Sequence, residues 1–477
     1  MRIIVSQKGA REHFLAARAL HRQGMLAALV TDWYAVGNEK AETLKTENLK
    51  AEKSQRLNIS AFQRICLPAF QHFSVSVFQL FVRRSRAALS ARSDEIPDDL
   101  VHAFPFRTLF WKWRERRLAA QGRSHEAFLQ TDSAFASKVA SLRLPDHNVF
   151  FGYSYASLET LRAEKARGII TVLDQIDPGP VEFRLVAEEM VRNPGLAGPP
   201  LSFPTAYYDR LRREWELADV LVVNSEWSRD AIIAEGADAS KIEVLPLAFE
   251  ENAEKLKTAQ WSKEQTPQAK EVRGQKSEVR VKPQSGNAAS SGPVVGSPVV
   301  SSPPRTLRVL WLGQVNVRKG IHYLMEAARL LERENVHFDV VGAIGILPAA
   351  VASAPKNMTF HGSVSRDRAA EWYRQSDVFV LPTLSDGFAL TQLEALAHGV
   401  PVITTPNCGR VVEDGKTGFI VPPRDAQALA DAIRRFVRNP KLAAEMSPRC
   451  IEASKAFSIE AYGKRLVEII QKHAGKR

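Results

Sequence analysis

The fold of this chain is decided by the stretch Asp377-Val-Phe-Val-Leu-Pro-Thr-Leu-Ser-Asp-Gly-Phe-Ala-Leu-Thr-Gln-Leu-Glu-Ala-Leu-Ala-His-Gly-Val-Pro-Val-Ile403. The stretch continues to Pro423. Its apolar run at 378–381 predicts a strand buried on both faces of a parallel sheet. Apolar residues then recur at helical spacing from 390 to 397 and stop at Gly399, and a second buried strand is expected at 400–405. Strand, loop, helix and strand form a parallel crossover unit, so the stretch predicts an α/β protein.

The loop at 383–387 is the first candidate ligand site, because ligands bind at the carboxyl ends of parallel strands. Asp386 supplies a carboxylate, and Gly387 permits a tight turn and a close approach. Glu394 lies one turn after the helix start, where we expect it to accept hydrogen bonds from ribose or sugar hydroxyls rather than to meet a phosphate. Backbone amides at a helix start favour an anion; here they belong to Gly387, Phe388, Ala389, Leu390 and Thr391.

The two acidic residues Asp386 and Glu394 flank Gly-Phe-x-Leu, and Glu-Ala-x-Ala-x-Gly-x-Pro-Val-Ile follows. This pattern resembles the signature of GT-B glycosyltransferases of family 4. The resemblance implies two Rossmann-like domains that face each other across a cleft, a C-terminal helix that crosses back to the first domain, and retaining transfer from nucleotide-activated sugars. It covers most of the second half of the chain and echoes weakly in the first. The family has Glu where this chain has Asp386, so the charge is kept but the reach is shorter by one methylene.

The resemblance and the changes in composition along the chain predict four parts. An acceptor-side Rossmann-like domain is expected at 1–250, with a low-complexity insertion at about 38–90. A linker rich in Ser, Gly, Pro and Val is expected at 251–306, since it carries no periodic apolar pattern and repeats Glu-Val-Arg at 271–273 and 278–280. A nucleotide-sugar-binding domain at 307–455 and a return helix at 456–477 complete the prediction.

The insertion contains an x-Phe-Gln unit that recurs with a period of eight, at 61–63, 69–71 and 77–79. We favour a low-complexity segment that is partly disordered. The alternative is an amphipathic patch that lies on a membrane, since Phe81 and Val82 are followed by three arginines in the next four positions.

Composition places the chain among soluble proteins of two α/β domains, with 477 residues, 45% hydrophobic and 25% charged. The net charge of +12 favours solvated basic surface with some attraction to anionic lipid. Nucleic acid is not an expected partner, because no recognised binding motif accompanies the charge.

The sequence also predicts the compartment. No apolar run approaches the roughly 18 residues of a membrane span, and the first residues read as a strand rather than a signal peptide. The three cysteines lack metal-ligand spacing and suit a reducing environment. A cytoplasmic protein is expected, with peripheral contact at the inner face of the membrane left open.

Two further candidates lie in the first half. Gly9, in the loop after the first expected strand, can bring its amide near a diphosphate; a plain strand-to-helix turn explains it equally well. Asp174 follows the strand expected at 169–173, where it would bind an acceptor hydroxyl or cap the next segment, and we favour the site role. The resembling family often has His at about this position. This chain has Asp174 there, so the role of that His is not carried over.

Lys319 precedes Gly320 at a helix start that follows the strand expected at 307–312. In the resembling family, a Lys at this position and an Arg one residue after the earlier glycine hold the donor diphosphate. The Lys is present, but Gln314 stands where the Arg is expected, and Arg318 is the candidate substitute. A plain exposed cation is the alternative reading of Lys319.

The combined prediction is a metal-independent retaining glycosyltransferase that uses a nucleotide-diphosphate sugar and a saccharide or lipid-linked acceptor. The chain contains no Asp-x-Asp, so fixed positive charge and helix amides must stabilise the leaving diphosphate. The catalytic candidates are Asp386, Lys319 and Asp174, and neither a metal nor another cofactor is expected. A second reading is a nucleotide-sugar-binding protein whose catalysis has decayed. A third, a GT-B epimerase or phosphorylase, has no matching site residues.

Overall fold

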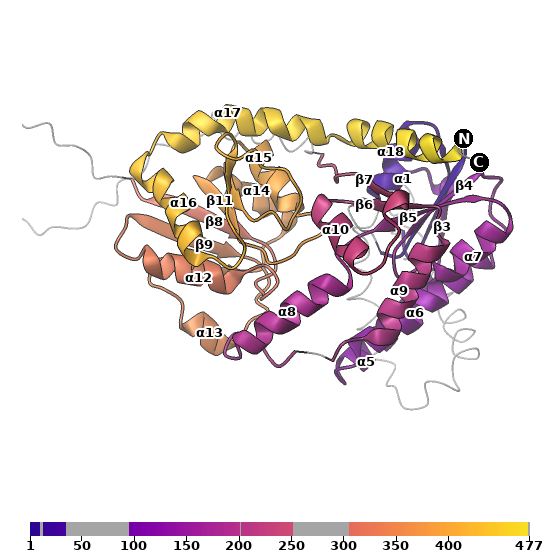
Figure 1. The fold of residues 1–477 in the computed structure, drawn as a ribbon, viewed down its shortest axis with the longest axis horizontal. Helices are drawn as coiled ribbons and strands as arrows, with labels where there is room; N and C mark the ends of the chain where they lie inside the picture. The colour runs from indigo at the N-terminus through magenta and orange to yellow at the C-terminus, as the bar shows by residue number, and fades with distance from the viewer. Residues whose placement is uncertain (10–12, 35–94, 201, 251–304, 476–477) are drawn as a thin grey trace, which may run out of the picture. The chain divides into compact units, whose positions relative to one another are not determined.

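The structure is a computed structural model that describes residues 1–9, 13–34, 95–200, 202–250 and 305–475 (Figure 1). The insertion predicted at about 38–90 lies outside these residues, and so does all of the predicted linker except its last two residues. Residues 1–249 and 307–477 belong to one compact unit.

The first half of the chain forms a parallel sheet of seven strands in the order β3-β2-β1-β4-β5-β6-β7. The strands are β1 (Ile3–Gln7), β2 (Leu26–Thr31), β3 (Val101–Ala103), β4 (Val149–Tyr153), β5 (Ile170–Gln175), β6 (Val220–Val223) and β7 (Ile242–Val244). The strand order reverses between β1 and β4, because the chain leaves the β1-β2-β3 side and resumes beside β1. Such a reversal is where a doubly wound sheet opens a crevice for ligands.

Both faces of this sheet are covered, which explains why its strands read as continuous apolar runs. Alternate side chains of one strand enter different clusters: Ile3 and Val5 pack in one, and Ile4 in the other. The helices of this half are α1 (Leu15–Arg22), α5 (Pro105–Ala119), α6 (Ser124–Ala140), α7 (Leu158–Ala166), α8 (Pro180–Arg192), α9 (Thr205–Leu217) and α10 (Glu226–Ala234). Short 3-10 turns occupy Asp98–Leu100 and Ala239–Lys241.

The second half forms a parallel sheet of six strands in the order β10-β9-β8-β11-β12-β13. They are β8 (Leu307–Leu312), β9 (Val336–Val341), β10 (Met358–Gly362), β11 (Val378–Leu381), β12 (Val402–Thr404) and β13 (Gly418–Ile420). Its helices are α12 (Ile321–Leu330), α13 (Pro348–Ala352), α14 (Arg366–Arg374), α15 (Leu390–Ala397), α16 (Ala426–Arg438), α17 (Leu442–Ser454) and α18 (Ile459–Ala474), with a 3-10 turn at Lys455–Phe457. The predicted pair of parallel α/β domains is confirmed.

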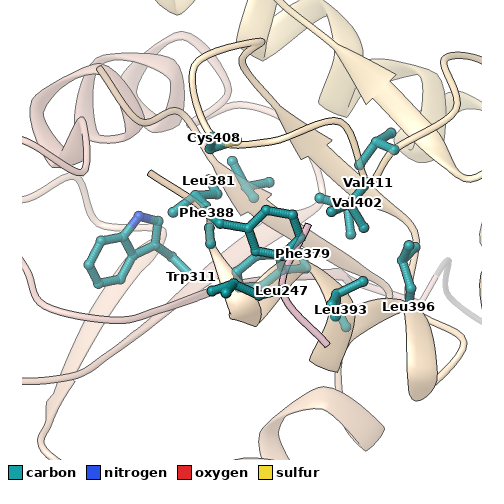
Figure 2. Packing of buried hydrophobic residues seen from close by; sticks show 14 of the residues in the cluster. Leu247, Trp311, Phe379, Leu381, Phe388, Leu393, Leu396, Val402, Cys408 and Val411 are labelled. Atoms are coloured by element: carbon teal, nitrogen blue, oxygen red, sulfur yellow. The ribbon is translucent and has the colours of Figure 1, made fainter. Parts of the chain in front are cut away.

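The core of the second sheet surrounds the stretch 377–403. Figure 2 shows buried side chains of this cluster, with Phe379 and Leu381 of β11 among those labelled, together with Leu393 and Leu396 of α15. Each of these four side chains is at most 1% exposed. The apolar face of α15 therefore anchors the helix, and the loop between β11 and α15 is held at both ends.

The last helix returns to the first half, as predicted. Figure 1 shows α18 beside α1, and Arg22 of α1 forms an ion pair of 2.6 Å with Glu460 of α18. A Cβ placed on Gly463 would meet Ala19 at 3.3 Å, so the two helices approach closely at this glycine. The backbone amide of Phe249 also donates to the carbonyl of Phe457, at 2.9 Å.

Some elements differ from the expectation. β5 runs to Gln175, two residues beyond the predicted strand, so Asp174 lies inside the strand rather than after it. The mainly apolar run ends at Leu173, but the parallel pairing of β5 with β6 continues to Gln175. Among the described residues, no helix combines the length and apolar character needed to cross a bilayer.

Candidate functional site

A cluster of charged side chains lies where β8 and β11 end in the second sheet. The ammonium of Lys319 pairs with one carboxylate oxygen of Asp386, and Nη1 of Arg318 lies 3.2 Å from the other. All three side chains are largely buried, and that of Lys319 is 13% exposed. The structure thus brings together the two cations predicted for the diphosphate and the carboxylate predicted for the sugar. Lys319 is not a plain exposed cation.

Backbone bonds between two loops fix this cluster. The amide of Leu384 donates to the carbonyl of Arg318 at 2.9 Å, and the hydroxyl of Thr383 donates to the same carbonyl at 3.1 Å. The amide of Lys319 donates to Oδ1 of Asn316 at 3.0 Å. Two hydrogen bonds to the carbonyl of Arg318 therefore hold the loop after β8 to the loop after β11, independently of the ion pairs.

Gly320 allows the two loops to approach this closely because it has no side chain. Its φ is 72°, in the left-handed region that favours glycine, and a Cβ there would stand 1.8 Å from the carbonyl oxygen of Pro382. Any side chain at this position would push the two loops apart and separate Lys319 from Asp386. The glycine that follows the lysine is thus a structural requirement of the cluster.

The first half contributes a residue that the sequence reasoning missed. Glu182, in the first turn of α8, accepts a hydrogen bond of 2.9 Å from the hydroxyl of Ser385 and lies 3.6 Å from Nη1 of Arg318. The same Ser385 hydroxyl accepts a bond of 3.0 Å from Nε1 of Trp227. The only signal in the sequence is that Glu182 follows Pro-Gly-Pro after the carboxyl end of a buried strand. No local pattern links it to a residue some 200 positions later.

The electrostatic state of the cluster follows from its burial. Burial, with the nearby Arg318 guanidinium, lowers the pKa of Lys319 to about 7, although the Asp386 carboxylate beside it favours the charged form. Burial raises the pKa of Glu182, against the attraction of Arg318. Two cations therefore face two carboxylates, Asp386 and Glu182, and an incoming anion must compete with these carboxylates for the cations.

Gly387 and the start of α15 form the second part of the predicted donor site. A Cβ on Gly387 would stand 2.7 Å from the carbonyl oxygen of Ile176, which also accepts the side-chain amide of Asn224 at 3.0 Å. Any larger residue would clash with this backbone. Phe388 is 7% exposed and packs in the core, in contact range of Gly409.

The predicted amides at the start of α15 differ in their availability. The amide of Ala389 donates to the carbonyl of Cys408 at 3.2 Å, so an anion would have to replace that bond. Leu390 and Thr391 are the first two residues of α15, where backbone amides have no partner within the helix. The hydroxyl oxygen of Thr391 is buried without a hydrogen-bond partner among the described residues. The helix start thus retains unused polar groups.

Glu394 makes its contact elsewhere. Its Oε2 accepts a hydrogen bond of 2.9 Å from the hydroxyl of Tyr373, a buried residue of α14. No hydrogen bond or ion pair among the described residues joins Glu394 to Lys319 or Asp386. Tyr373 fixes one carboxylate oxygen, and the ribose role of Glu394 stays a prediction.

The two candidates of the first half lie on the first sheet. The amide of Gly9, where φ is 86°, donates to Oδ1 of Asp32 at 2.8 Å, so a diphosphate would have to displace this carboxylate. Asp174 is 6% exposed and stands in register with Tyr153 of β4 and Val222 of β6, near the carboxyl end of β5. Their site roles stay predictions. Within the described residues, no group of three or more His, Cys, Asp or Glu could hold a metal ion.

Known proteins resemble this chain over different shares of its length. Residues 306–439 match the family model described as Glycosyl transferases group 1. A D-inositol 3-phosphate glycosyltransferase from Arthrobacter sp. (strain FB24) is 28% identical over 192 residues, which are 36% of this chain and 46% of that protein. The lipopolysaccharide core biosynthesis mannosyltransferase LpsB from Rhizobium meliloti (strain 1021) is 37% identical over 106 residues, 21% of this chain and 30% of that protein. The chain thus spans less than half the length of these curated relatives.

Two solved structures match almost the whole chain. Anabaena Alr3699/HepE in complex with UDP-glucose has a TM-score of 0.51 at 14% identity and covers 99% of this chain and 100% of its own. Sucrose-phosphate synthase (tll1590) from Thermosynechococcus elongatus has a TM-score of 0.53 at 16% identity and covers 100% of both chains. At such identities the likeness shows the shared fold of two parallel-sheet α/β domains.

Proposed function

We propose that this chain, which has the GT-B fold and a group 1 glycosyltransferase domain at residues 306–439, is a retaining, metal-independent glycosyltransferase. It would move a sugar from a nucleotide-diphosphate sugar to a saccharide or lipid-linked acceptor. A lipid-linked acceptor would bring the protein to a membrane surface.

The observation that carries this proposal is the buried cluster of Lys319, Arg318 and Asp386. Among the described residues, the anions that pair with these two cations are carboxylates. A diphosphate can replace them, so the two cations form a receptor for it. The start of α15 adds backbone amides and the hydroxyl of Thr391, which lacks a partner among the described residues. Relatives of the fold support the choice of anion, since HepE is solved with UDP-glucose.

In the proposed reaction, an acceptor hydroxyl oxygen bonds to the anomeric carbon as the bond from that carbon to the diphosphate breaks. The electron pair of the broken bond leaves with the diphosphate, and the proton of the hydroxyl passes to a phosphate oxygen. Lys319 and Arg318 stabilise the charge that develops on the leaving group, and Asp386 accepts hydrogen bonds from the hydroxyls of the transferred sugar.

The test is to incubate the purified full chain with a panel of nucleotide sugars, with and without EDTA, and to follow nucleotide release and donor binding. The proposal predicts slow donor hydrolysis that EDTA does not change and that Lys319→Met abolishes. Lys416→Met is the matched control, because Lys416 is an exposed cation paired with Glu413. Tight binding without turnover would instead support a decayed binding protein. Loss of activity in EDTA would contradict the metal-independent mechanism.

A further inference from the structure

A cavity of about 410 Å³ is lined by residues of the first half of the chain, without Lys319 or Asp386. Its volume is within the range of roughly 300–1,000 Å³ typical of small-molecule sites. We call it the tyrosine pocket; its lining includes Lys8, Asp32, Glu115, Asp132, Tyr155 and Tyr207. Lining residues follow the carboxyl ends of β1, β2 and β4, which are neighbours in the sheet. The pocket therefore opens at the point where the strand order reverses.

A strained tyrosine forms part of the wall. Tyr155 has a φ of 74°, which costs a residue other than glycine about 1–2 kcal/mol. Its backbone is held by two charged groups: its amide donates to Glu214 at 2.6 Å, and its carbonyl accepts from Nε of Arg210 at 2.8 Å. Its hydroxyl donates to Asp177 at 2.8 Å. Strain maintained by so many partners is typical of a binding site rather than of a plain turn.

The ring of Tyr155 stacks on that of Tyr207, with centroids 4.6 Å apart and planes within 6°. Tyr207 comes from α9 and is only partly buried, and its hydroxyl donates to Asp132 at 3.3 Å. The stack gives the pocket a rigid aromatic surface beside polar groups. Such a combination suits a ring that has both apolar C–H faces and hydroxyl groups.

The charges of the pocket select against an anion. Lys8 lies 2.7 Å from Asp132 and 3.1 Å from Glu115, and Lys112 lies 2.9 Å from Glu115. Lys8 and Lys112 are the cations among the described lining residues, and both are already paired. Three carboxylates, with Asp32 as the third, line the same space. The three carboxylates outnumber the two lysines here, whereas two carboxylates face two cations at the cluster of Lys319 and Asp386. This excess of negative charge disfavours a phosphate, and the carboxylate oxygens can accept hydrogen bonds from hydroxyls.

We propose that the tyrosine pocket binds an uncharged sugar ring of the acceptor and rejects a phosphorylated one, with Tyr207 as its platform and Glu115 and Asp132 as its hydroxyl acceptors. This inference rests on the proposed glycosyl transfer and deepens it, since it names the chemistry of the acceptor. Gly9 lines the pocket and is also a donor candidate, but no other donor candidate lines the pocket.

The experiment uses the full chain and the nucleotide sugar that the donor panel identifies. Methyl hexosides and the matching hexose 6-phosphates are compared as acceptors through the rate of nucleotide release. The expected result is a kcat/KM at least about tenfold higher for the neutral hexosides. Equal or faster reaction with the sugar phosphates would overturn the inference while leaving the proposed function intact.

Three variants sharpen the test. Tyr207→Ala should raise the KM for the hexoside about tenfold with little change in kcat or in donor affinity, because it removes aromatic contact from the acceptor alone. Glu115→Gln keeps the shape of the side chain and removes one negative charge, so it should reduce the preference over sugar phosphates severalfold. Phe110→Ala, an exposed residue of the same helix outside the pocket, should change neither value. An unchanged KM in Tyr207→Ala would contradict the assignment.

A failure of the proposed function gives a different pattern. If no nucleotide sugar binds or is hydrolysed, binding of methyl hexosides is measured by ligand-observed NMR on the same protein. Binding that Tyr207→Ala weakens and Phe110→Ala does not would support the pocket even without transfer. Absence of hexoside binding would overturn the pocket as well.

Discussion

The ammonium of Lys319 pairs with the carboxylate of Asp386, although 67 residues separate them in the sequence. Each stands in a loop after a buried parallel strand, and the two loops share backbone hydrogen bonds. The pair places a cation suited to a phosphate directly beside an anion suited to hydroxyls. A nucleotide-diphosphate sugar carries a diphosphate on the anomeric carbon and hydroxyls on the other carbons of the same ring, so one donor molecule can meet both members of the pair.

Replacing Lys319 by Ala should weaken binding of a nucleotide sugar about tenfold to a hundredfold, because a hydrogen bond to a charged group contributes about 1.5–3 kcal/mol. Isothermal calorimetry of the variant and of the Lys416→Ala control measures the effect. An affinity equal to that of the control would show that Lys319 only maintains the loop.

Donor binding should weaken as the pH rises above about 7. Burial lowers the pKa of Lys319 to about 7 in the free protein, and a bound diphosphate would raise it by stabilising the charged form. Donor binding then takes up a proton. The affinity for the donor is therefore highest below the pKa of Lys319 in the free protein, and it falls by up to about tenfold per pH unit above that pKa.

Calorimetry with an intact nucleotide sugar between pH 6 and 9 tests this pH dependence, since such a donor lacks a terminal phosphate that titrates in this range. The Lys319→Arg variant is the control, because a guanidinium keeps its charge throughout. An equally steep decline in that variant would assign the pH dependence to another group.

Glu182→Gln should bind the donor more tightly, by about tenfold. The substitution removes a carboxylate that lies 3.6 Å from Arg318 and would repel a diphosphate, while the amide keeps the contact with Ser385. Glu188→Gln, on the same helix but paired with Arg424 and Arg192, is the matched control. Weaker binding in Glu182→Gln would show that this carboxylate contributes to the site instead of competing with the donor.

Asp386→Asn should lower kcat about a hundredfold and leave the affinity for the donor unchanged or higher. The amide no longer forms ion pairs with Lys319 and Arg318, so only Glu182 still competes with the diphosphate for these cations, but the strong hydroxyl acceptor is lost. Asp386→Glu restores the charge and should recover part of the rate. A parallel loss of kcat and of donor affinity would mean that Asp386 acts only in donor binding.

Gly320→Ala should destabilise the protein by about 3 kcal/mol, since a Cβ would meet the Pro382 carbonyl at 1.8 Å in addition to the strain of its φ of 72°. Gly122→Ala isolates the strain, because Gly122 has a φ of 74° and nothing within 4 Å of a Cβ. Its expected cost is about 1 kcal/mol. Chemical denaturation of both variants measures the difference, and equal losses would rule out the steric contact between the loops.

The central strands of both sheets could be predicted because their side chains are buried on both faces of the sheet. The continuous apolar run at 378–381 coincides with β11, and the mainly apolar stretch predicted as a strand at 307–312 coincides with β8. The helix α8 was missed, because its sequence Pro-Val-Glu-Phe-Arg-Leu-Val-Ala-Glu-Glu-Met-Val-Arg buries only Pro180 and Glu189. A helix without a buried apolar face shows no helical spacing of apolar residues from which it could be predicted.

Some features of the candidate site could likewise be predicted from the sequence, and others could not. The local placement of Lys319, Gly387 and Asp386 could be predicted, since each follows a recognisable strand within one local motif, while their roles in donor binding stay predictions. The partners of Arg318 and the stacking of Tyr155 on Tyr207 could not be predicted, because they join residues from separate loops and helices. Gly9 illustrates the limit: its turn was predicted, but its bond to Asp32 depends on the neighbouring strand.

The sequence by itself determined two parallel α/β sheets and the local placement of a lysine, a carboxylate and a helix start beside strand ends, because burial and backbone geometry act over a few residues. Only the tertiary structure decided that Lys319 pairs with Asp386, that Glu182 competes for the same cations, and that a pocket lined by carboxylates opens between β1 and β4. Electrostatic energy depends on distances between atoms, and residues far apart in the chain acquire those distances only when the sheets assemble.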